Sequence, residues 1–232
     1  MRALWFTLAI VLVDQVTKVI VKTTMVKYES IPVIGDVFKW TFTENPGMAF
    51  GLELWDGEPI GKLLLSVFSV VATVAIFFYL RHVRDSPAGY RLSLAFILGG
   101  ALGNVIDRVF YAEIWGYGHI FFGNVVDFIH LDVWSGVVPE SVPFLGGKYL
   151  SIFPIGNVAD LAIIAGVVGV LWTQTAFQEH VTAKHRAERE AAADAVAPEA
   201  AAPRAGAAPE ASGVSAPAAM EPHVDPAPPP VA

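Results

Sequence analysis

Residues 92–110 read LSLAFILGGALGNVIDRVF, an apolar run with one asparagine, one aspartate and one arginine near its end. At about 1.5 Å of rise per residue, a helix of this length spans a hydrocarbon core of about 30 Å. Three similar runs lie at about 3–21, 60–80 and 152–172. The chain has 232 residues and 54% of them are hydrophobic, which is rare for a soluble domain. The sequence therefore predicts a mainly α membrane protein with four transmembrane helices.

Two alternatives compete with this interpretation. A soluble bundle with buried helices is one, but four uncapped apolar runs of this length are rare in water. The other concerns the first run, which follows Arg2 as a signal peptide would. However, Asp14 and Lys18 interrupt that run and no cleavage site with small residues follows, so we expect a retained helix.

The orientation in the membrane follows from the basic residues. They cluster in the link between the second and third helices and after the fourth helix: Arg81, Arg84, Arg91, Lys184, Arg186 and Arg189. Because cytoplasmic segments carry an excess of Lys and Arg, we expect both termini in the cytoplasm. The segments at about 23–59 and 111–151 then lie outside.

The outer segments and the C-terminal region differ in pattern. Phe38, Trp40 and Phe42 alternate with polar residues, which predicts a strand in a small β-sheet on the outer, periplasmic face. The last part of the chain is rich in Ala and Pro and has little to bury. We therefore expect a four-helix domain over 1–175 and a disordered cytoplasmic tail over 176–232.

Composition excludes several kinds of chemistry. The sequence has no cysteine, so disulfides, thiolate metal sites and cysteine nucleophiles are excluded. The formal net charge is −7, and no basic excess indicates binding to nucleic acid.

Acidic side chains at membrane depth are the candidate functional groups, because burying them in a bilayer is costly. Helix lengths place Asp14, Asp107 and Asp160 in the outer half of the membrane, and Asp127 lies in an apolar run that can return toward the helices. Asparagines accompany two of them at a helical spacing of three residues: Asn104 before Asp107, and Asn157 before Asp160. Such asparagines either orient a carboxylate or link helices. Gly99 and Gly103 add a face of small residues for close helix packing.

Charge context separates the four aspartates. Arg108 follows Asp107, and Lys18 lies one helical turn from Asp14, so these two acids suit structural pairing. Asp127 and Asp160 have no basic residue close in sequence. If their carboxyls face each other, repulsion should leave one protonated and one ionised, as acid–base hydrolysis of a peptide bond requires.

Other chemistries remain as alternatives. A serine–lysine pair of Ser151 and Lys148 is one, and a metal site of Asp127, His130 and Asp132 is another. Membrane aspartates also serve in proton or ion transport, although no inverted repeat is visible. A scaffold without catalytic activity would explain the glycines but not the acids.

Five motifs together resemble one family, the bacterial lipoprotein signal peptidases, also called signal peptidase II. They are VDQVTK (13–18), ENPGMAFG (44–51), GGALGNVIDR (99–108), VVDF (125–128) and NVAD (157–160). The resemblance covers about residues 5–172. It implies an inner-membrane aspartic peptidase that cleaves prolipoproteins before a lipid-modified cysteine.

The resemblance assigns the catalytic pair to Asp127 and Asp160. Other motif positions, which shape the site, bind substrate or stabilise the fold, match Asp14, Asn45, Asn104, Asp107, Arg108, Asn157 and Ala159. The aspartates act on water directly, so no metal or organic cofactor is expected. The expected partners are lipid-modified prolipoproteins, membrane lipids and inhibitors of the globomycin type. One chain carries the whole site, so we expect a monomer.

The sequence departs from the family pattern at two places. Gly156 stands where the family usually has Phe, which predicts a looser start of the fourth helix without loss of activity. The stretch 131–150 is longer than in many members, and its prolines and glycines predict an additional outer loop or hairpin. This segment either covers the site as a lid or has a structural role.

Overall fold

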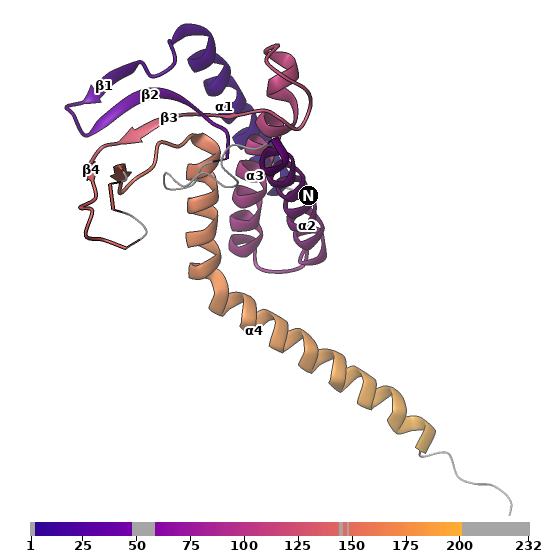
Figure 1. Cartoon of the computed structure of the whole chain (residues 1–232). Helices are drawn as coiled ribbons and strands as arrows, with labels where there is room; N and C mark the ends of the chain where they lie inside the picture. The colour runs from indigo at the N-terminus through magenta and orange to yellow at the C-terminus, as the bar shows by residue number, and fades with distance from the viewer. Residues whose placement is uncertain (1–2, 48–58, 144–145, 148, 201–232) are drawn as a thin grey trace, which may run out of the picture. The chain divides into compact units, whose positions relative to one another are not determined.

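The computed structural model describes residues 3–47, 59–143, 146–147 and 149–200. Its elements are α1 (Ala3–Thr24), β1 (Ser30–Ile34), β2 (Phe38–Asn45), α2 (Pro59–His82), α3 (Ala88–Ile114), β3 (Val125–Leu131), β4 (Ser135–Val137), β5 (Tyr149–Ser151) and α4 (Val158–Ala200). Within the described ranges, four helices are long and apolar enough to cross a membrane. The predicted mainly helical membrane fold with a small sheet is confirmed (Figure 1).

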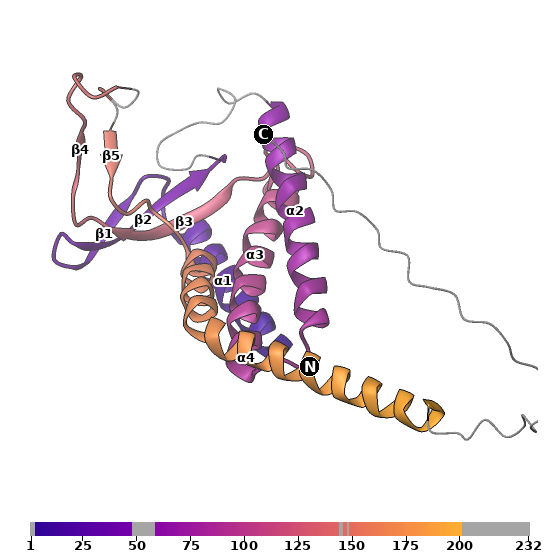
Figure 2. The same cartoon turned by 90° about the horizontal axis from the view of Figure 1, so that it is seen from below.

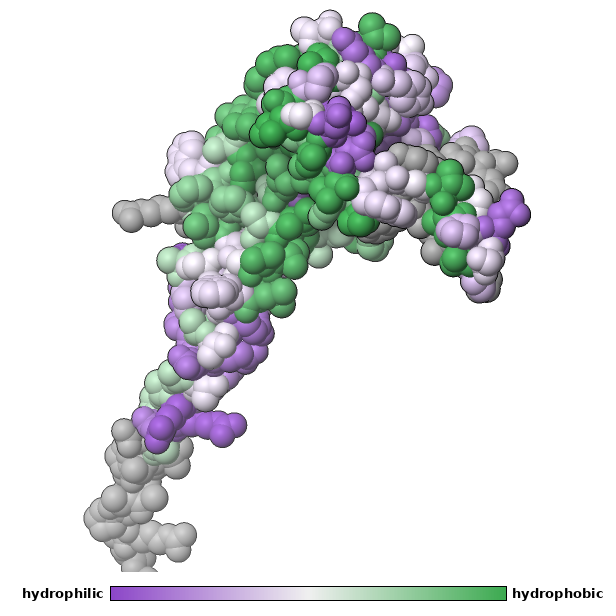
Figure 3. Space-filling view, turned by 90° about the vertical axis from the view of Figure 1, so that its left-hand side faces the viewer, coloured by the Kyte–Doolittle hydropathy of each residue, from purple (hydrophilic) through white to green (hydrophobic). Residues whose placement is uncertain are grey.

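Helix α3 packs against both α1 and α2. It buries Ala95 and Leu98, and the hydroxyl of Thr7 on α1 donates to the carbonyl oxygen of Ala95 at 3.0 Å. On the outside of the bundle, large apolar side chains are exposed: Phe68 by 69% and Trp172 by 84%. Figure 3 shows such side chains as a broad apolar band over the helices. A surface of this kind is stable in lipid rather than in water.

Strands β1, β2 and β3 form an antiparallel sheet in that order. The strand predicted from the alternation at 38–42 is confirmed as part of β2, and Phe42 is buried. The sheet lies at the end of the bundle where α1 ends and α4 begins (Figures 1 and 2). Val126 on β3 is fully buried, and its N–H donates to Asp107 Oδ2 on α3 at 3.2 Å. The run around Asp127 therefore returns to the helices, as predicted.

The fourth helix differs from its predicted span of 152–172. It begins only at Val158, because the residues just before it bind to β3. It continues to Ala200, through the first part of the segment for which composition predicts a disordered tail. Ala, Glu, Gln, Lys and Arg dominate this extension and favour a helix even where no apolar face is buried. Residues 201–232 of the predicted tail lie outside the described residues.

The other helices match their predicted spans more closely, and α3 extends beyond 92–110 at both ends. Hydropathy marks the part of a helix that lies in lipid, whereas hydrogen bonding continues into the flanking polar turns.

A short hairpin occupies part of the stretch 131–150. Strands β4 and β5 pair antiparallel, with Ser135 opposite Ser151. The predicted extra loop or hairpin is therefore a hairpin, while its role as a lid stays a prediction. Residues 144–145 and Lys148 lie outside the described residues, and so does the serine–lysine pair considered above.

Candidate active site

Asp127 is fixed on β3 by two asparagines from other elements. Its side chain is buried, and Asn157 Nδ2 donates to its Oδ1 at 2.7 Å. Asn45, the last residue of β2, adds a second side-chain hydrogen bond. The amide of Asn45 is itself oriented, because its Oδ1 accepts the N–H of Gly47 at 2.8 Å. Amide nitrogens therefore face the carboxylate of Asp127.

Asp160 lies in the first turn of α4, and hydrogen bonds hold both of its carboxylate oxygens. Asn104 Nδ2 on α3 donates to Oδ1 at 2.9 Å, and the backbone N–H of Asn157 donates to Oδ2 at 3.1 Å. Asn157 Oδ1 in turn accepts the N–H of Asp160 at 3.0 Å. This reciprocal pair is a capping box, in which two residues at a helix start satisfy each other's N–H groups. The geometry that begins α4 therefore also fixes Asp160.

Asn157 connects the two aspartates. Its Nδ2 contacts Asp127, while its backbone N–H and Oδ1 contact Asp160. The same Nδ2 lies 3.2 Å from Asn104 Oδ1, which closes a network between β3, α3 and α4. The side chain of Asn157 is fully buried. The structure thus brings together the two aspartates that the sequence predicts as a pair.

The backbone before α4 explains why they meet. The carbonyl oxygen of Gly156 accepts the N–H groups of Phe128 and Ile129 at 2.8 and 2.7 Å, and its own N–H donates to Ile129 O at 3.0 Å. The chain is therefore attached to β3 beside Asp127. These bonds depend on the backbone and not on a side chain, so they form with glycine at this position, and the looser start of α4 stays a prediction.

The electrostatic environment of Asp127 favours its protonated form. Burial, followed by the neighbouring charge of Asp160, raises the pKa of Asp127 to about 7, although hydrogen bonds from Asn157 and Asn45 oppose the shift. A carboxyl with a pKa near neutrality can hold a proton beside an ionised partner. Asp127 can therefore carry a proton near neutral pH.

A buried lysine organises the other two aspartates. Lys18 is fully buried, with its Nζ 2.9 Å from Asp14 Oδ2 and 2.8 Å from Asp107 Oδ2. The same Nζ donates to Asn104 Oδ1 at 3.0 Å, so the three acceptors match the three N–H bonds of an ammonium group. Because Lys18 occupies the oxygen of Asn104, the amide nitrogen is directed to Asp160. The sequence pairs Lys18 with Asp14 but does not reveal this indirect contact with the site.

Asp107 interacts with two cations. Its neighbour Arg108, the expected cation, interacts with it electrostatically, and Lys18 from α1 forms the direct ion pair. Successive helical residues point about 100° apart, so neighbours in sequence rarely touch. Asp14 pairs with Lys18 as predicted, and its Oδ1 accepts the N–H of Ala159 at 2.9 Å. A carboxylate at this place also stabilises the positive end of α4.

Arg108 is directed toward the predicted pair. Its half-buried guanidinium interacts electrostatically with Asp127, Asp107 and Asp160. The sequence separates Asp127 and Asp160 from the other aspartates because no cation is adjacent, yet the fold supplies one from α3. Arg108 therefore belongs to the site, as the motif position implies.

An ion pair fastens the end of β2 to α1. Glu44 pairs with Lys22, whose Nζ also lies 5.2 Å from the ring centre of Trp115 and 5.3 Å from that of Tyr117. Burial alone would raise the pKa of Glu44, but the hydrogen bond and charge of Lys22 lower it below its usual value. This anchor, which the sequence does not indicate, positions the adjacent Asn45.

Glycines allow α3 to approach its neighbours beside the site. Gly99 faces Ile10 and Gly103 faces Asp14, both on α1, which confirms the predicted close-packing face. Gly100 faces the carbonyl oxygen of Ala159 on α4.

Replacing Gly100 with alanine should destabilise the protein. A methyl group there would overlap the backbone carbonyl of Ala159, which cannot yield without moving the start of α4. Overpacking of this kind costs about 1–3 kcal/mol, so the unfolding temperature should fall by about 3–10 °C. Thermal unfolding in detergent measures the change. Gly89→Ala is the matched control, because its nearest neighbour is a methyl group of Thr173 at 3.1 Å; equal losses in both variants would contradict the prediction.

The residues considered as a metal site are not brought together. His130 Nδ1 lies 3.0 Å from Thr41 Oγ1, and Asp132 pairs with Lys39 at 3.0 Å, so neither side chain joins Asp127. Over the part of the chain that the structure describes, no group of three His, Asp or Glu residues is arranged to hold a metal ion.

Known proteins resemble this chain along most of its length. The family described as signal peptidase (SPase) II matches residues 6–176. A lipoprotein signal peptidase of Amoebophilus asiaticus is 36% identical over 188 residues, covering 76% of this chain and 79% of the relative. Another, from Chlorobium phaeobacteroides, is 36% identical over 165 residues, covering 70% and 89%. A solved structure of a bacterial membrane enzyme has a TM-score of 0.54 and 26% identity, covering 75% of this chain and 87% of that chain.

The matched range begins before Asp14 and ends after Asp160, so it includes every residue of the site. It also includes the four apolar helical segments and the sheet. Sequence, fold and comparisons agree: the chain belongs to the signal peptidase II family, the aspartic peptidases that remove signal peptides from lipoproteins.

Proposed function

We propose that Asp127 and Asp160 are the catalytic residues, and that the substrate is a prolipoprotein whose cysteine carries a diacylglyceryl group. The observation that carries this proposal is the asparagine bridge: Asn157 contacts both carboxylates and holds them at one site. Asp160 accepts N–H donors at both oxygens, which suits an ionised carboxylate, while the raised pKa of Asp127 suits the proton carrier.

The mechanism follows from this division of roles. Asp160 takes a proton from a water molecule, whose oxygen attacks the carbonyl carbon of the scissile peptide. Asp127 gives its proton to the carbonyl oxygen, so the tetrahedral intermediate carries no full negative charge. The proton held by Asp160 then passes to the nitrogen and the C–N bond breaks, while one hydroxyl of the intermediate returns its proton to Asp127, so both aspartates regain their starting states. Arg108, whose charge acts on both aspartates, limits their mutual repulsion while the proton moves.

The orientation proposed for the chain places this site toward the outer face of the bacterial inner membrane, with both termini in the cytoplasm. The basic residues of the α2–α3 link and of the α4 extension support it. A lipidated precursor is amphiphilic and can approach sideways from the bilayer, with its acyl chains on the apolar outer surface of the helices. Inhibitors of the globomycin type should compete with it, and a single chain should suffice for activity.

The rate of cleavage should fall as pH rises through about 7. Below that pH Asp127 holds the proton that the mechanism needs, and above it the carboxyl becomes ionised, so the donor is lost. The dependence of kcat/KM on pH for the purified enzyme should therefore show an alkaline limb with a midpoint near 7. A rate that rises across the same interval would contradict the role given to Asp127.

The substrate class is tested with two forms of one precursor. The full chain in detergent micelles should cleave the diacylglyceryl-modified form before its cysteine and leave the unmodified form intact. Equal cleavage of both forms would refute the proposed lipid requirement while leaving the peptidase activity in place. A membrane transporter, the alternative of another class, would instead show an ion flux in liposomes that depends on Asp14 or Asp107.

A further inference from the structure

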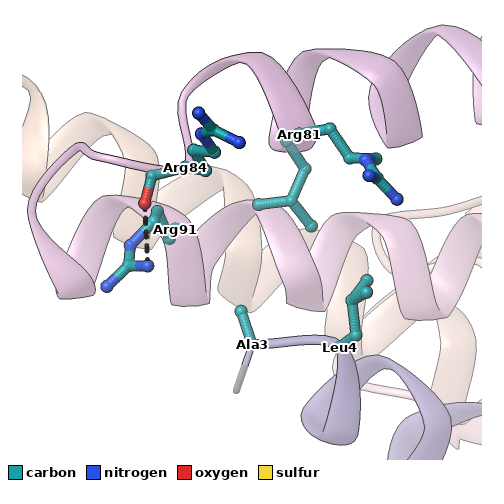
Figure 4. Close-up of a pocket in the computed structure, with 6 residues that line it drawn as sticks. Ala3, Leu4, Arg81, Arg84 and Arg91 are labelled. Atoms are coloured by element: carbon teal, nitrogen blue, oxygen red, sulfur yellow. Dashed lines mark hydrogen bonds between the residues drawn. The ribbon is translucent and has the colours of Figure 1, made fainter. Parts of the chain in front are cut away.

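A pocket lies at the end of the bundle away from the aspartate pair. It has a volume of about 170 Å³ and is lined by Ala3, Leu4, Leu80, Arg81, Arg84 and Arg91. Figure 4 shows the three arginines coming from the end of α2, the following link and the start of α3, around the start of α1. About 20 Å of helix separates Arg91 from Asn104 at the active site, so the two sites are independent.

Among the described residues, the three arginines have no strong acidic partner. Arg91 Nη1 donates to the carbonyl oxygen of Arg84 at 2.9 Å, but its Nε is buried without a hydrogen-bond partner in the described structure. Arg84 Nε lies 3.7 Å from Asp85 Oδ2, and both side chains are largely exposed, so this pair contributes little. Arg81 lies over the ring of Phe77 at 5.8 Å. Within the described residues, no acidic side chain therefore closely neutralises the three arginines that line this pocket.

The walls of the pocket are apolar. Leu80 is buried in the cluster that joins α2 to α3, and Leu4 packs against that cluster. Their neighbours on the same helices, Trp5 and Phe78, expose 72% and 63% of their surface. An exposed tryptophan at the end of a transmembrane segment, such as Trp5, lies at the level of the lipid headgroups. The arginines of the pocket thus lie beside an apolar surface, formed by Leu4 and Leu80 and continued by Trp5 and Phe78.

We propose that this pocket binds one anionic phospholipid of the cytoplasmic leaflet. Its phosphate accepts hydrogen bonds from the arginine side chains, and the first carbons of its acyl chains contact Leu4 and Leu80. Guanidinium groups pair readily with phosphate oxygens, and basic pockets between helices on the cytoplasmic side suit such headgroups. The bound lipid would join the start of α1 to the α2–α3 link.

Native mass spectrometry of the full chain in detergent tests this proposal. Delipidated protein is titrated with dioleoylphosphatidylglycerol or with zwitterionic dioleoylphosphatidylcholine, without substrate, so the result does not depend on the proposed catalysis. Phosphatidylglycerol should bind more tightly. Arg91→Gln and Arg81→Gln should each weaken its binding about fivefold, because one basic residue near a membrane surface contributes about that factor.

Lys184→Gln is the matched control, because it removes the same charge on α4 at a residue that does not line the pocket. Its phosphatidylglycerol affinity should equal that of the wild type. Arg81 is exposed, so its substitution tests the pocket even if Arg91→Gln fails to fold. Equal binding of the two lipids, an equal loss in Lys184→Gln, or displacement of the lipid by excess sn-glycerol 3-phosphate would each overturn the proposal. If removal of residues 201–232 makes the lipid bind more tightly, the chain's own acidic tail competes for the pocket, and the proposal that a lipid is its occupant is overturned.

Discussion

Asp127→Asn and Asp160→Asn should each reduce cleavage of a lipidated precursor by about a thousandfold or more, because general acid–base catalysis alone contributes about 10²–10⁴-fold. Asp127→Asn keeps an oxygen for the donor Asn157 but cannot carry the transferable proton. Asp160→Asn removes the base. Both oxygens of Asp160 accept an N–H group, one from Asn104 and one from Asn157, so the new amide nitrogen must face one of these donors and cannot accept its hydrogen bond. Asp127 likewise accepts from both Asn157 and Asn45, so we expect each substitution to lower the stability as well, by about 1 kcal/mol.

Turnover of the modified precursor and thermal unfolding measure the two effects separately. Asp132→Asn is the matched control, since it makes the same substitution just after β3, where the carboxylate pairs with Lys39 rather than with the site. It should keep wild-type turnover. Near-normal turnover in folded Asp127→Asn or Asp160→Asn would remove that residue from the catalytic pair.

Lys18→Met should be the most destabilising single substitution considered. It leaves the carboxylates of Asp14 and Asp107 buried without their common cation and frees the oxygen of Asn104. Removing one partner of a buried ion pair costs about 3–5 kcal/mol, since the remaining charge stays desolvated. Turnover should fall too, because Asn104 can then rotate its amide away from Asp160.

Equilibrium unfolding in mixed detergent micelles measures this loss. Lys39→Met is the control: it removes a partly exposed ion pair with Asp132 and should cost below about 1 kcal/mol. Adding Asp107→Asn to Lys18→Met should recover part of the stability, because one of the two unpaired charges is removed. A loss in Lys18→Met no greater than in Lys39→Met, or a further loss in the double variant, would show that the buried triad is not what stabilises the bundle.

The sequence predicts most of the membrane fold because lipid imposes a simple rule on it. Apolar runs of fixed length mark the four helices, and the alternation at Phe38, Trp40 and Phe42 marks β2. The limits of α4 follow other rules. Its start depends on a backbone bridge from Gly156 to β3, and its extension to Ala200 on helix propensity. The hydropathy of the sequence predicts neither the backbone bridge nor the helical extension.

The sequence likewise predicts some features of the site and not others. Motifs and charge context select Asp127 and Asp160, and the fold brings them together. Sequence neighbours show only part of the contacts where helix geometry decides them: Arg108 interacts with Asp107 and also with the proposed catalytic pair, and Lys18 reaches Asp107 from another helix. Such contacts depend on how α1 and α3 are rotated against each other, which one sequence does not specify.

The capping box at the start of α4 couples catalysis to fraying of the helix end. When the first turn opens, Asn157 releases the N–H of Asp160, and the proposed catalytic base loses its position in the same event. A cap of this kind contributes only about 1 kcal/mol, so opening is accessible at ambient temperature. Hydrogen exchange at the Asp160 amide therefore reports the fraction of enzyme molecules that are ready to act, and substrates or inhibitors that bind across this turn should slow that exchange.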